Sequence, residues 1–519
     1  MDSPFSQYFH TNYIPSNSEI KRIQTSLTSY LTELSRLDLL IRDLTSRRKK
    51  LAEYVDSHRA LISCGRRLPR DILQEIFTAC LPIHRNAIMS AKEAPLLLCH
   101  VCSGWRGIAY STGALWASLH LPLEFIFARG LHTAAIEWLA RSAGCPLSIS
   151  IVGSRNMMQW REDNPDYVDS VMEALVQSSA RWRTAELSFN AEEGLFMLSA
   201  ANSPRLEVIT LGVEPSEMVS LDLLGAENLR SVTLNARHSS LNPFISYLPL
   251  NWDRLTHLSF GSPGLSVENV ISVVRNCSRL TTFRIAVRRH RPNDVPLSVL
   301  ITSSVVLSCL ENLTILDEVD PPHVEFLVRQ LQMPQLHRFE VPKTLHVMDT
   351  VAFLANLGKF SPLIEDFNID LARLMRLSLS ENLRQLDYLK TITVTDSWDP
   401  RWLRGAEDKA DISYLISLLT PDPDSPLICP RLESLQIKEW VSTSSDKDSQ
   451  SYLLEFAHRR LDASTNFRRL AVTYGAYVEP ISSTVLQSFA ARGLVITTSS
   501  TAHPLERSPA VMPWTGLEH

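Results

Sequence analysis

Two cysteines separated by two residues, Cys99 and Cys102, have the spacing of zinc ligands, and His100 lies between them. A structural zinc site needs four ligands, which usually come as two such pairs. The chain has no second pair, and Cys80 is the only other nearby thiol. The leucine-rich surroundings favour a helix in which both thiols are small core groups. We therefore expect neither a metal site nor another cofactor.

A basic cluster runs from Arg288 to Arg291, directly after a predicted strand. Arginine side chains suit phosphate and carboxylate groups, so one interpretation is a site for an acidic or phosphorylated client, or for nucleic acid. The other interpretation is a solvated surface loop. We favour the loop, because a single run of charge usually lies on the surface.

The motifs of common enzymes are absent from the sequence. The segment Gly261 to Gly264 lacks the lysine and the spacing of a phosphate-binding loop, and neither a nucleophile elbow nor an HExxH motif occurs. The 15 histidines form no cluster with ligand spacing. The sequence therefore predicts a protein that is not itself an enzyme.

Composition limits the partners and the compartment. The chain has 519 residues, 45% of them apolar, and a net charge of −5, which argues against nucleic acid and anionic membranes as partners. It has no run of about 18 apolar residues, so no spanning helix is expected. Residues Met1 to His10 do not resemble a secretory signal. Eight scattered cysteines predict reduced, buried thiols and a cytoplasmic or nuclear protein.

The N-terminal part predicts one long helix with a heptad repeat over residues 18–64, after a disordered segment 1–17. Ser18 could cap this helix, and Gly65 could end it. Its apolar seam, broken only by Arg48 and His58, consists of Ile20, Ile23, Leu27, Tyr30, Leu34, Leu37, Ile41, Leu44, Leu51, Val55 and Ile62. Such a seam suits a coiled coil. Self-association through residues 20–62 and packing back on the same chain both remain open.

A second region, residues 66–118, concentrates large apolar groups in a short helical stretch. Pro69 and Asp71 begin a helix well, because proline suits the first turn and a carboxylate suits the positive end of the dipole. The recognisable elements are Leu68-Pro69, Asp71-Ile72-Leu73, Glu75-Ile76-Phe77, Val101-Cys102, Trp105-Arg106, Ile108 and Leu115-Trp116. About fifty residues cannot hide all of these groups, so some of them should face a partner.

These elements resemble the F-box family. The whole arrangement is similar to fungal F-box proteins with an N-terminal heptad helix and degenerate leucine-rich repeats. The resemblance implies a trihelical F-box that binds the S-phase-kinase-associated adaptor and, through it, a cullin in an SCF-type ubiquitin ligase. The adaptor-binding residues implied are Leu68, Pro69, Ile72, Leu73, Ile76, Phe77, Leu98, Val101 and Trp105. For Ile76 and Trp105, burial within the module is an equal alternative. The span Pro82 to Glu93 is longer than the usual loop between the first helices.

The third region, residues 146–498, repeats the pattern leucine, two residues, apolar, one residue, apolar. The pattern begins at Leu206, Leu229, Leu255, Leu280, Leu310, Leu336, Ile364, Leu389, Leu432 and Phe467, with Trp182 as a weaker first member. Each match predicts a strand, and helical patterns lie between the matches. The prediction is an α/β fold: an irregular leucine-rich-repeat solenoid with parallel strands on the concave side and helices on the convex side. A helical linker, 119–145, precedes it, and a disordered tail, 499–519, follows.

Several helices of this region can be placed. Ser266 and Asp349 are expected N-caps, and Pro321 is expected to open a helix. Residues Ile412 to Leu419 predict an inserted helix, and Ser442 to Ser449 predict an exposed loop. The Asn or Cys that usually ties the turn of such repeats is missing from the ten that begin at Leu206 to Phe467, so these repeats must be held together differently.

Strand residues that point away from the core should form the client-binding surface. In the expected register they are Thr210, Gly212, Thr233, Asn235, Ser259, Arg284, Thr314, Glu340, Asn368, Asp370, Thr393, Gln436 and Lys438. Their mixed size and charge name no class of client. The predicted function is that of a substrate-recognition subunit of an SCF-type ligase. A protein-interaction scaffold without ligase function is the alternative.

Overall fold

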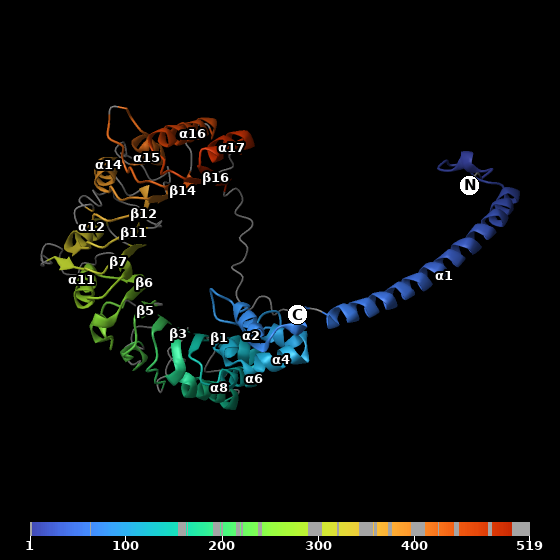
Figure 1. Cartoon of the computed structure of the whole chain (residues 1–519), viewed down its shortest axis with the longest axis horizontal. Helices are drawn as coiled ribbons and strands as arrows, with labels where there is room; N and C mark the ends of the chain where they lie inside the picture. The colour runs from blue at the N-terminus through green and yellow to red at the C-terminus, as the bar shows by residue number, and fades with distance from the viewer. Residues whose placement is uncertain are drawn as a thin grey trace. The chain divides into compact units, whose positions relative to one another are not determined.

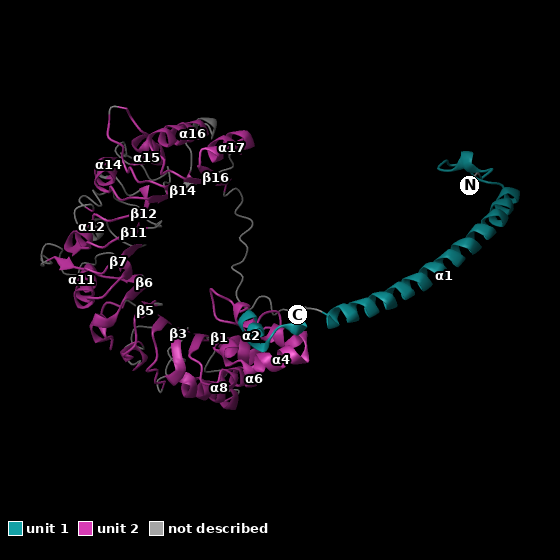
Figure 2. Ribbon diagram, viewed as in Figure 1, with its two compact units in different colours: residues 1–76 teal, residues 77–519 magenta. Residues whose placement is uncertain are grey.

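A computed structural model of the chain (Figure 1) divides into two compact units, Met1–Ile76 and Phe77–His519 (Figure 2). It describes residues 3–500 except 63, 154–161, 163–164, 190–197, 199–200, 214–217, 219–221, 237–240, 289–303, 319–320, 342–356, 358–360, 372–375, 396–409, 424, 441–445 and 476–479. Of the helices in these residues, none combines the length and apolar character needed to span a lipid bilayer.

The first unit is built on the helix α1 (Asn17–Leu61). Its N-cap is Ser16, two residues before the expected Ser18. Ser16 Oγ accepts a hydrogen bond from the Glu19 backbone N–H, and the Glu19 carboxylate accepts one from the Ser16 N–H at 2.8 Å. This reciprocal capping box explains the earlier start, because it satisfies two backbone donors at once. The helix ends at Leu61, before the expected stop at Gly65.

The segment before α1, expected to be disordered, contains local structure in its described residues. A 3-10 turn, η1, spans Ser6–Tyr8, and the rings of Tyr8 and Tyr13 stack with centroids 4.0 Å apart. The Tyr13 hydroxyl donates to the Glu19 carboxylate, which ties this turn to the first residues of α1. The expected disorder over residues 1–17 is therefore corrected for residues 3–17, the last of which begins α1.

Short helices precede and accompany a large sheet in the rest of the chain. They are α2 (Arg70–Ala79), α3 (Leu96–Val101), α4 (Ser103–Ser111), α5 (Leu123–Ala128), α6 (His132–Arg141), α8 (Pro165–Ser178), α11 (Val267–Asn276), α12 (Pro321–Gln330), α14 (Arg376–Gln385), α15 (Ile412–Leu419), α16 (Asp446–Ala463) and α17 (Ser483–Ala491). The helix α2 runs across the boundary between the two units. Within the second unit, Figure 1 shows α8, α11, α12, α14 and α15 on the outer side of the arc of strands.

The sheet has 14 strands, and every neighbouring pair is parallel. In spatial order they are β1 (Ser118–Pro122), β2 (Leu147–Val152), β3 (Trp182–Ser188), β4 (Val208–Gly212), β5 (Ser231–Leu234), β6 (His257–Leu265), β7 (Thr282–Arg288), β9 (Asn312–Glu318), β11 (Arg338–Val341), β12 (Asp366–Asp370), β13 (Thr391–Thr395), β14 (Ser434–Trp440), β15 (Arg469–Tyr474) and β16 (Val495–Ser500). Two further short strands, β8 (Val305–Val306) and β10 (Leu331–Gln332), pair separately. The order of strands in space follows the order in the chain, which is what stacked repeats produce.

The core follows the predicted repeat. All eleven residues expected to begin a repeat, from Trp182 to Phe467, are at most 1% exposed. The two apolar strand positions align from repeat to repeat: Leu258 lies beside Phe283, and Phe283 lies beside Leu313. The predicted strand register is therefore confirmed for these strands.

A ladder of backbone hydrogen bonds joins the repeats where each strand begins. The carbonyl of Glu207 accepts from the N–H groups of Arg230 and Ser231, at 2.9 and 3.0 Å, and that of Arg230 accepts from two N–H groups of the next repeat. The same paired acceptance recurs at Thr256, Thr281, Glu311, His337, Glu365, Lys390 and Glu433. Since backbone groups supply these bonds, the repeats stack without an asparagine at a fixed turn position.

The structure differs from several expected boundaries. The expected helical linker 119–145 contains α5 and α6, but it begins in strand β1, so the sheet starts before residue 146. The first two residues of the expected tail, 499 and 500, belong to β16, and residues 501–519 lie outside those described. Of the expected loop Ser442–Ser449, residues 446–449 lie in α16, which begins at Asp446, and residues 442–445 lie outside those described.

The expected helix starts have mixed outcomes. Ser266 caps α11 by accepting from the Asn269 N–H, and α12 begins at Pro321, as predicted. The inserted helix α15 has the predicted bounds, with Asp411 as its N-cap. The helix expected after Asp349 lies outside the described residues.

Candidate partner-binding surface

The helix α2 divides its apolar residues between a buried and an exposed side. Leu73 and Phe77, four residues apart, are 6% and 0% exposed. Ile72 and Ile76, also four residues apart, are 44% and 40% exposed. Residues with this spacing share one side of a helix, so the two pairs form two separate apolar stripes. Burial favours a core role for Leu73 and Phe77, whereas Ile72 and Ile76 remain accessible to a partner.

The residues just before α2 are accessible as well. Leu68 is 36% exposed, and Pro69 is exposed with its carbonyl accepting from the Leu73 N–H at 3.1 Å. Proline at this point costs no helical hydrogen bond, because the first N–H groups of a helix have no partner within it. Leu68 and Pro69 are thus held at a defined helix start.

In the second unit, α3 and α4 carry the remaining predicted residues. Val101 is 56% exposed, whereas Leu98 is 5% exposed and belongs to the core. Trp105 is half-buried, and its ring lies 4.8 Å from that of Phe77. Leu97, which sequence reasoning missed, is 45% exposed. Adjacent helical residues point about 100° apart, and in α3 the buried side holds Leu98 and Cys99, so Leu97 is left facing outward.

We expected Cys99 and Cys102 to lie within one helix. The structure instead places Cys102 at a break between two helices. α3 ends at Val101, Cys102 has an extended backbone, and its exposed Sγ accepts from the Trp105 N–H at 3.4 Å as the cap of α4. Cys99 is buried, and burial raises the pKa of its thiol. Among the described residues, no three His, Cys, Asp or Glu side chains gather as metal ligands.

Other cysteines vary in exposure. Cys277 and Cys429 are buried, and burial raises the pKa of each thiol to about 12. Cys80 and Cys309 are exposed, which corrects the expectation that the thiols are generally buried. The seven cysteines from Cys80 to Cys429 are free thiols.

Tyr110 and Trp116, near the end of the predicted F-box motif, pack against α6. Trp116 is fully buried, donates from its indole Nε1 to the Ala109 carbonyl at 2.9 Å, and meets Trp138 of α6 edge-on at 4.9 Å. The Arg141 guanidinium lies over the rings of Tyr110 and Trp116, at 4.6 and 4.9 Å from their centroids. These contacts are all within the second unit. They couple α4 to α6 through packed aromatic groups and a cation–π contact.

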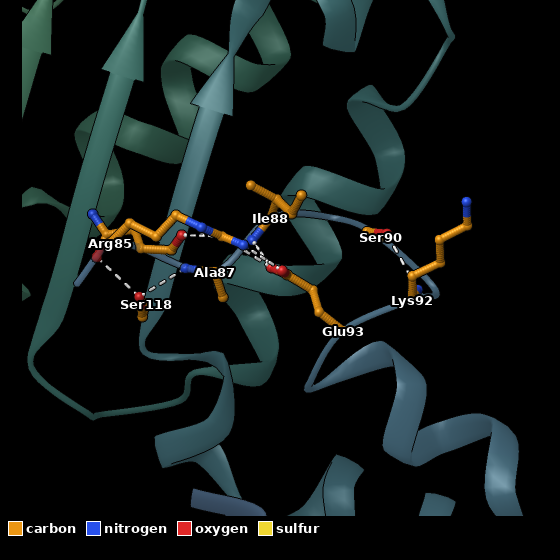
Figure 3. Close-up of polar contacts among 8 residues, drawn as sticks. Arg85, Ala87, Ile88, Ser90, Lys92, Glu93 and Ser118 are labelled. Atoms are coloured by element: carbon orange, nitrogen blue, oxygen red, sulfur yellow. Dashed lines mark hydrogen bonds and ion pairs between the residues drawn. The ribbon is translucent and has the colours of Figure 1, made fainter. Parts of the chain in front are cut away.

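The long span after α2 is folded against the first strand of the sheet (Figure 3). Glu93 accepts from the Ile88 N–H at 2.8 Å and pairs with Arg85 at 2.5 Å. The Ala87 carbonyl accepts from the His120 N–H at 2.8 Å, and its N–H donates to Ser118 Oγ at 3.1 Å. The span therefore covers the outer edge of β1, where unpaired backbone groups would otherwise be open to other chains.

The side of the sheet opposite the repeated apolar positions presents mostly polar residues in aligned rows. One row, in register, is Ser150, Glu186, Thr210, Thr233, Ser259, Arg284, Thr314, Glu340, Asn368, Thr393, Gln436, Ala471 and Thr497. Of the residues expected on this side, Asp370 and Thr393 are buried, at 0% and 7% exposure. Alternation along a strand sets the direction of a side chain, but neighbouring segments decide whether it reaches solvent.

Charged groups on this side pair with one another. Arg338 Nε lies 3.0 Å from a Glu340 carboxylate oxygen and 3.1 Å from one of Asp366, and the Thr314 hydroxyl donates to Glu340 at 3.1 Å. Burial raises the pKa of Asp366, and Arg338 opposes that shift. Of the predicted basic cluster, Arg288 ends β7, and residues 289–291 lie outside the described part.

Comparison with known proteins finds distant likeness only among solved structures. No protein-family model and no curated protein matches the chain. Among solved structures, the chain is similar to one from the crystal structure of the Rad7 and Elc1 complex in yeast. The two share 14% sequence identity and a TM-score of 0.36, over 72% of this chain and 89% of the other.

Proposed function

We propose that the protein is the substrate-recognition subunit of an SCF-type cullin-RING ubiquitin ligase. Residues 66–116 would act as an F-box that binds the S-phase-kinase-associated adaptor. The strand-rich unit would be an irregular leucine-rich-repeat solenoid that binds a protein client. In this role the chain performs no chemistry, and it raises the effective concentration of the client near the conjugating enzyme.

The observation that carries the proposal is the set of exposed apolar side chains at motif positions. A helix that buries Leu73 and Phe77 could carry polar residues at positions 72 and 76, yet both are isoleucines, 44% and 40% exposed. Exposed apolar groups gathered on one short stretch mark an interaction site. The proposed adaptor-contacting residues are Leu68, Pro69, Ile72, Ile76, Leu97, Val101 and the half-buried Trp105.

The connection to the sheet supports the second half of the proposal. A receptor must hold its client at a fixed distance from the ligase, which requires a stiff joint between the two binding regions. Within the second unit, only residues 112–117 separate α4 from β1. The contacts of Trp116 with Trp138, and of Arg141 with Tyr110 and Trp116, hold α4 against α6, which precedes β2 in the chain. The aligned rows of the sheet would supply the surface that binds the client.

The test is purification of the full chain with the adaptor, compared with a variant carrying L68A and P69A. The proposal predicts a stoichiometric complex for the wild type and a weaker one for the variant. Both substitutions are at exposed sites, so thermal unfolding should change little and serves as the control. A wild-type chain that retains no adaptor at micromolar concentration would overturn the proposal in favour of a scaffold without ligase function. The compartment proposed is the cytoplasm or the nucleus.

A further inference from the structure

The helix α1 exposes its apolar seam along its whole length. None of its 45 residues is buried, and seam residues such as Leu27, Leu34 and Leu51 are 46%, 56% and 66% exposed. At 1.5 Å per residue the helix is ~67 Å long, which is more than six heptads. A long helix with an exposed apolar seam gains stability mainly by packing the seam against a partner.

We propose that this partner is the α1 helix of a second copy of the chain, running antiparallel. In this arrangement, Ile20 of one helix lies opposite the partner's His58, and the seam pairs symmetrically about Leu39. The layers would be Ile20 with the partner's His58, Ile23 with the partner's Val55, Leu27 with the partner's Leu51, Tyr30 with the partner's Arg48, Leu34 with the partner's Leu44 and Leu37 with the partner's Ile41. Each layer occurs twice.

The charged interruption of the seam favours this direction. In a parallel pair of the same register, Arg48 would face the partner's Arg48, so two like charges would be removed from water together. In the antiparallel pair, Arg48 faces the partner's Tyr30, whose ring can receive a guanidinium and leaves a polar tip for solvent. The chain already uses this combination, because Arg141 lies over the ring of Tyr110.

The charges that flank the seam favour the antiparallel arrangement as well. A parallel pair would bring Glu33 beside the partner's Asp38, which repels it. The antiparallel pair brings Glu33 beside the partner's Arg47, twice, and Leu40 beside the partner's Leu40. Its one unfavourable contact is Asp38 with the partner's Asp38. In the present structure Glu33 pairs with Arg36 at 2.8 Å and Arg47 with Asp43 at 2.9 Å, both exposed, so either group can exchange partners at little cost.

Charge reversal at Glu33 distinguishes the antiparallel from the parallel pair, because it should weaken the first and strengthen the second. In the antiparallel pair, E33R places a positive charge beside the partner's Arg47, whereas in a parallel pair it creates an attraction to the partner's Asp38. The expected result is an approximately tenfold increase in the dimer dissociation constant. The double variant E33R/R47E should restore the wild-type value, because it re-forms the pair with its charges exchanged. E53R, on the opposite side of the helix, makes the same charge change and should have little effect.

The experiment is sedimentation of the full-length chain over a concentration series, with wild type, E33R, E33R/R47E, E53R and the seam variant L34E. A concentration-dependent dimer that L34E abolishes, E33R weakens and the double variant restores supports the proposal. A wild type that is monomeric throughout, or a dimer that survives L34E, excludes a second copy on this seam. A dimer that E33R strengthens shows a parallel pair and overturns the proposed direction.

Discussion

The helix α2 yields a sharp prediction, because its two apolar stripes should separate binding from folding. Replacing Ile72 and Ile76 together by alanine removes accessible methyl groups but little of the core. Burying an isoleucine side chain completely contributes roughly 1.5–3 kcal/mol, so the 44% and 40% still exposed correspond to roughly 0.6–1.2 kcal/mol each on adaptor binding. The pair therefore contributes about 1.2–2.4 kcal/mol, and the double variant should bind the adaptor about 8- to 60-fold more weakly.

The matched variants lie on the same helix. L73A and F77A remove side chains that are 6% and 0% exposed, and each should lower the free energy of unfolding by about 2–5 kcal/mol. In the I72A/I76A variant the loss should stay within about 1 kcal/mol, because alanine is a good helix former and little core is removed.

Titration calorimetry with purified adaptor and urea unfolding of each variant give the two quantities. The expected pattern is weak binding with retained stability for I72A/I76A, and reduced stability for L73A and F77A. If I72A/I76A binds as tightly as the wild type while remaining folded, the exposed stripe is not the contact, and the reasoning from exposure is refuted.

Two further predictions concern buried polar groups. Arg460 is fully buried and donates to the carbonyls of Leu419, Ile428 and Cys429. R460M should leave these acceptors unsatisfied and lower the urea midpoint by the equivalent of about 2–4 kcal/mol in the free energy of unfolding. An unchanged midpoint would show that Arg460 does not stabilise the fold through these hydrogen bonds. Burial lowers the pKa of His120 from 6.5 to about 4. As the pH falls, His120 of the unfolded chain therefore takes up a proton before His120 of the folded chain does. The free energy of unfolding should decline between pH 6.5 and 4, by an amount on the order of 2 kcal/mol after solvent screening. H120Q should flatten this decline in urea midpoints measured at pH 7, 5 and 4.5, and an equally steep decline would rule out His120 as its source.

Much of the repeat pattern could be predicted because it depends on local periodicity. Leu206, Leu280 and Leu389 begin repeats and are fully or almost fully buried, since an apolar group at that place must face the stack on both sides. The helix over Ile412–Leu419 was placed with its exact bounds, because an acidic cap and a short apolar run determine it locally.

Features that depend on distant contacts could not be predicted. The strand β1 was missed because it is short, ends in Pro122 and lacks the leading leucine of a repeat. The span from Pro82 to Glu93 folds because Asn86 Oδ1 accepts from the hydroxyls of Ser118 and Ser148, the latter 62 residues away. Local sequence carries no signal for such a pairing.

The exposure of the candidate residues could be predicted for some of them but not for all. The motif gives the apolar positions but not the side of the helix on which each one lies. Leu98 was therefore predicted to contact the adaptor, although the exposed residue is Leu97. In the same way, the cysteine pair was placed within one helix, although Cys102 has an extended backbone and begins a new one. Helix breaks of a single residue are set by how the two helices pack, which periodicity does not encode.

Adaptor binding by the intact chain tests the central claim most directly. Purified full-length protein and purified S-phase-kinase-associated adaptor, mixed at micromolar concentration and separated by size-exclusion chromatography with light scattering, should elute as a complex with one adaptor per chain. Elution of the two proteins as separate peaks, with the chain shown to be folded by its unfolding transition, would contradict the proposal that residues 66–116 are an F-box.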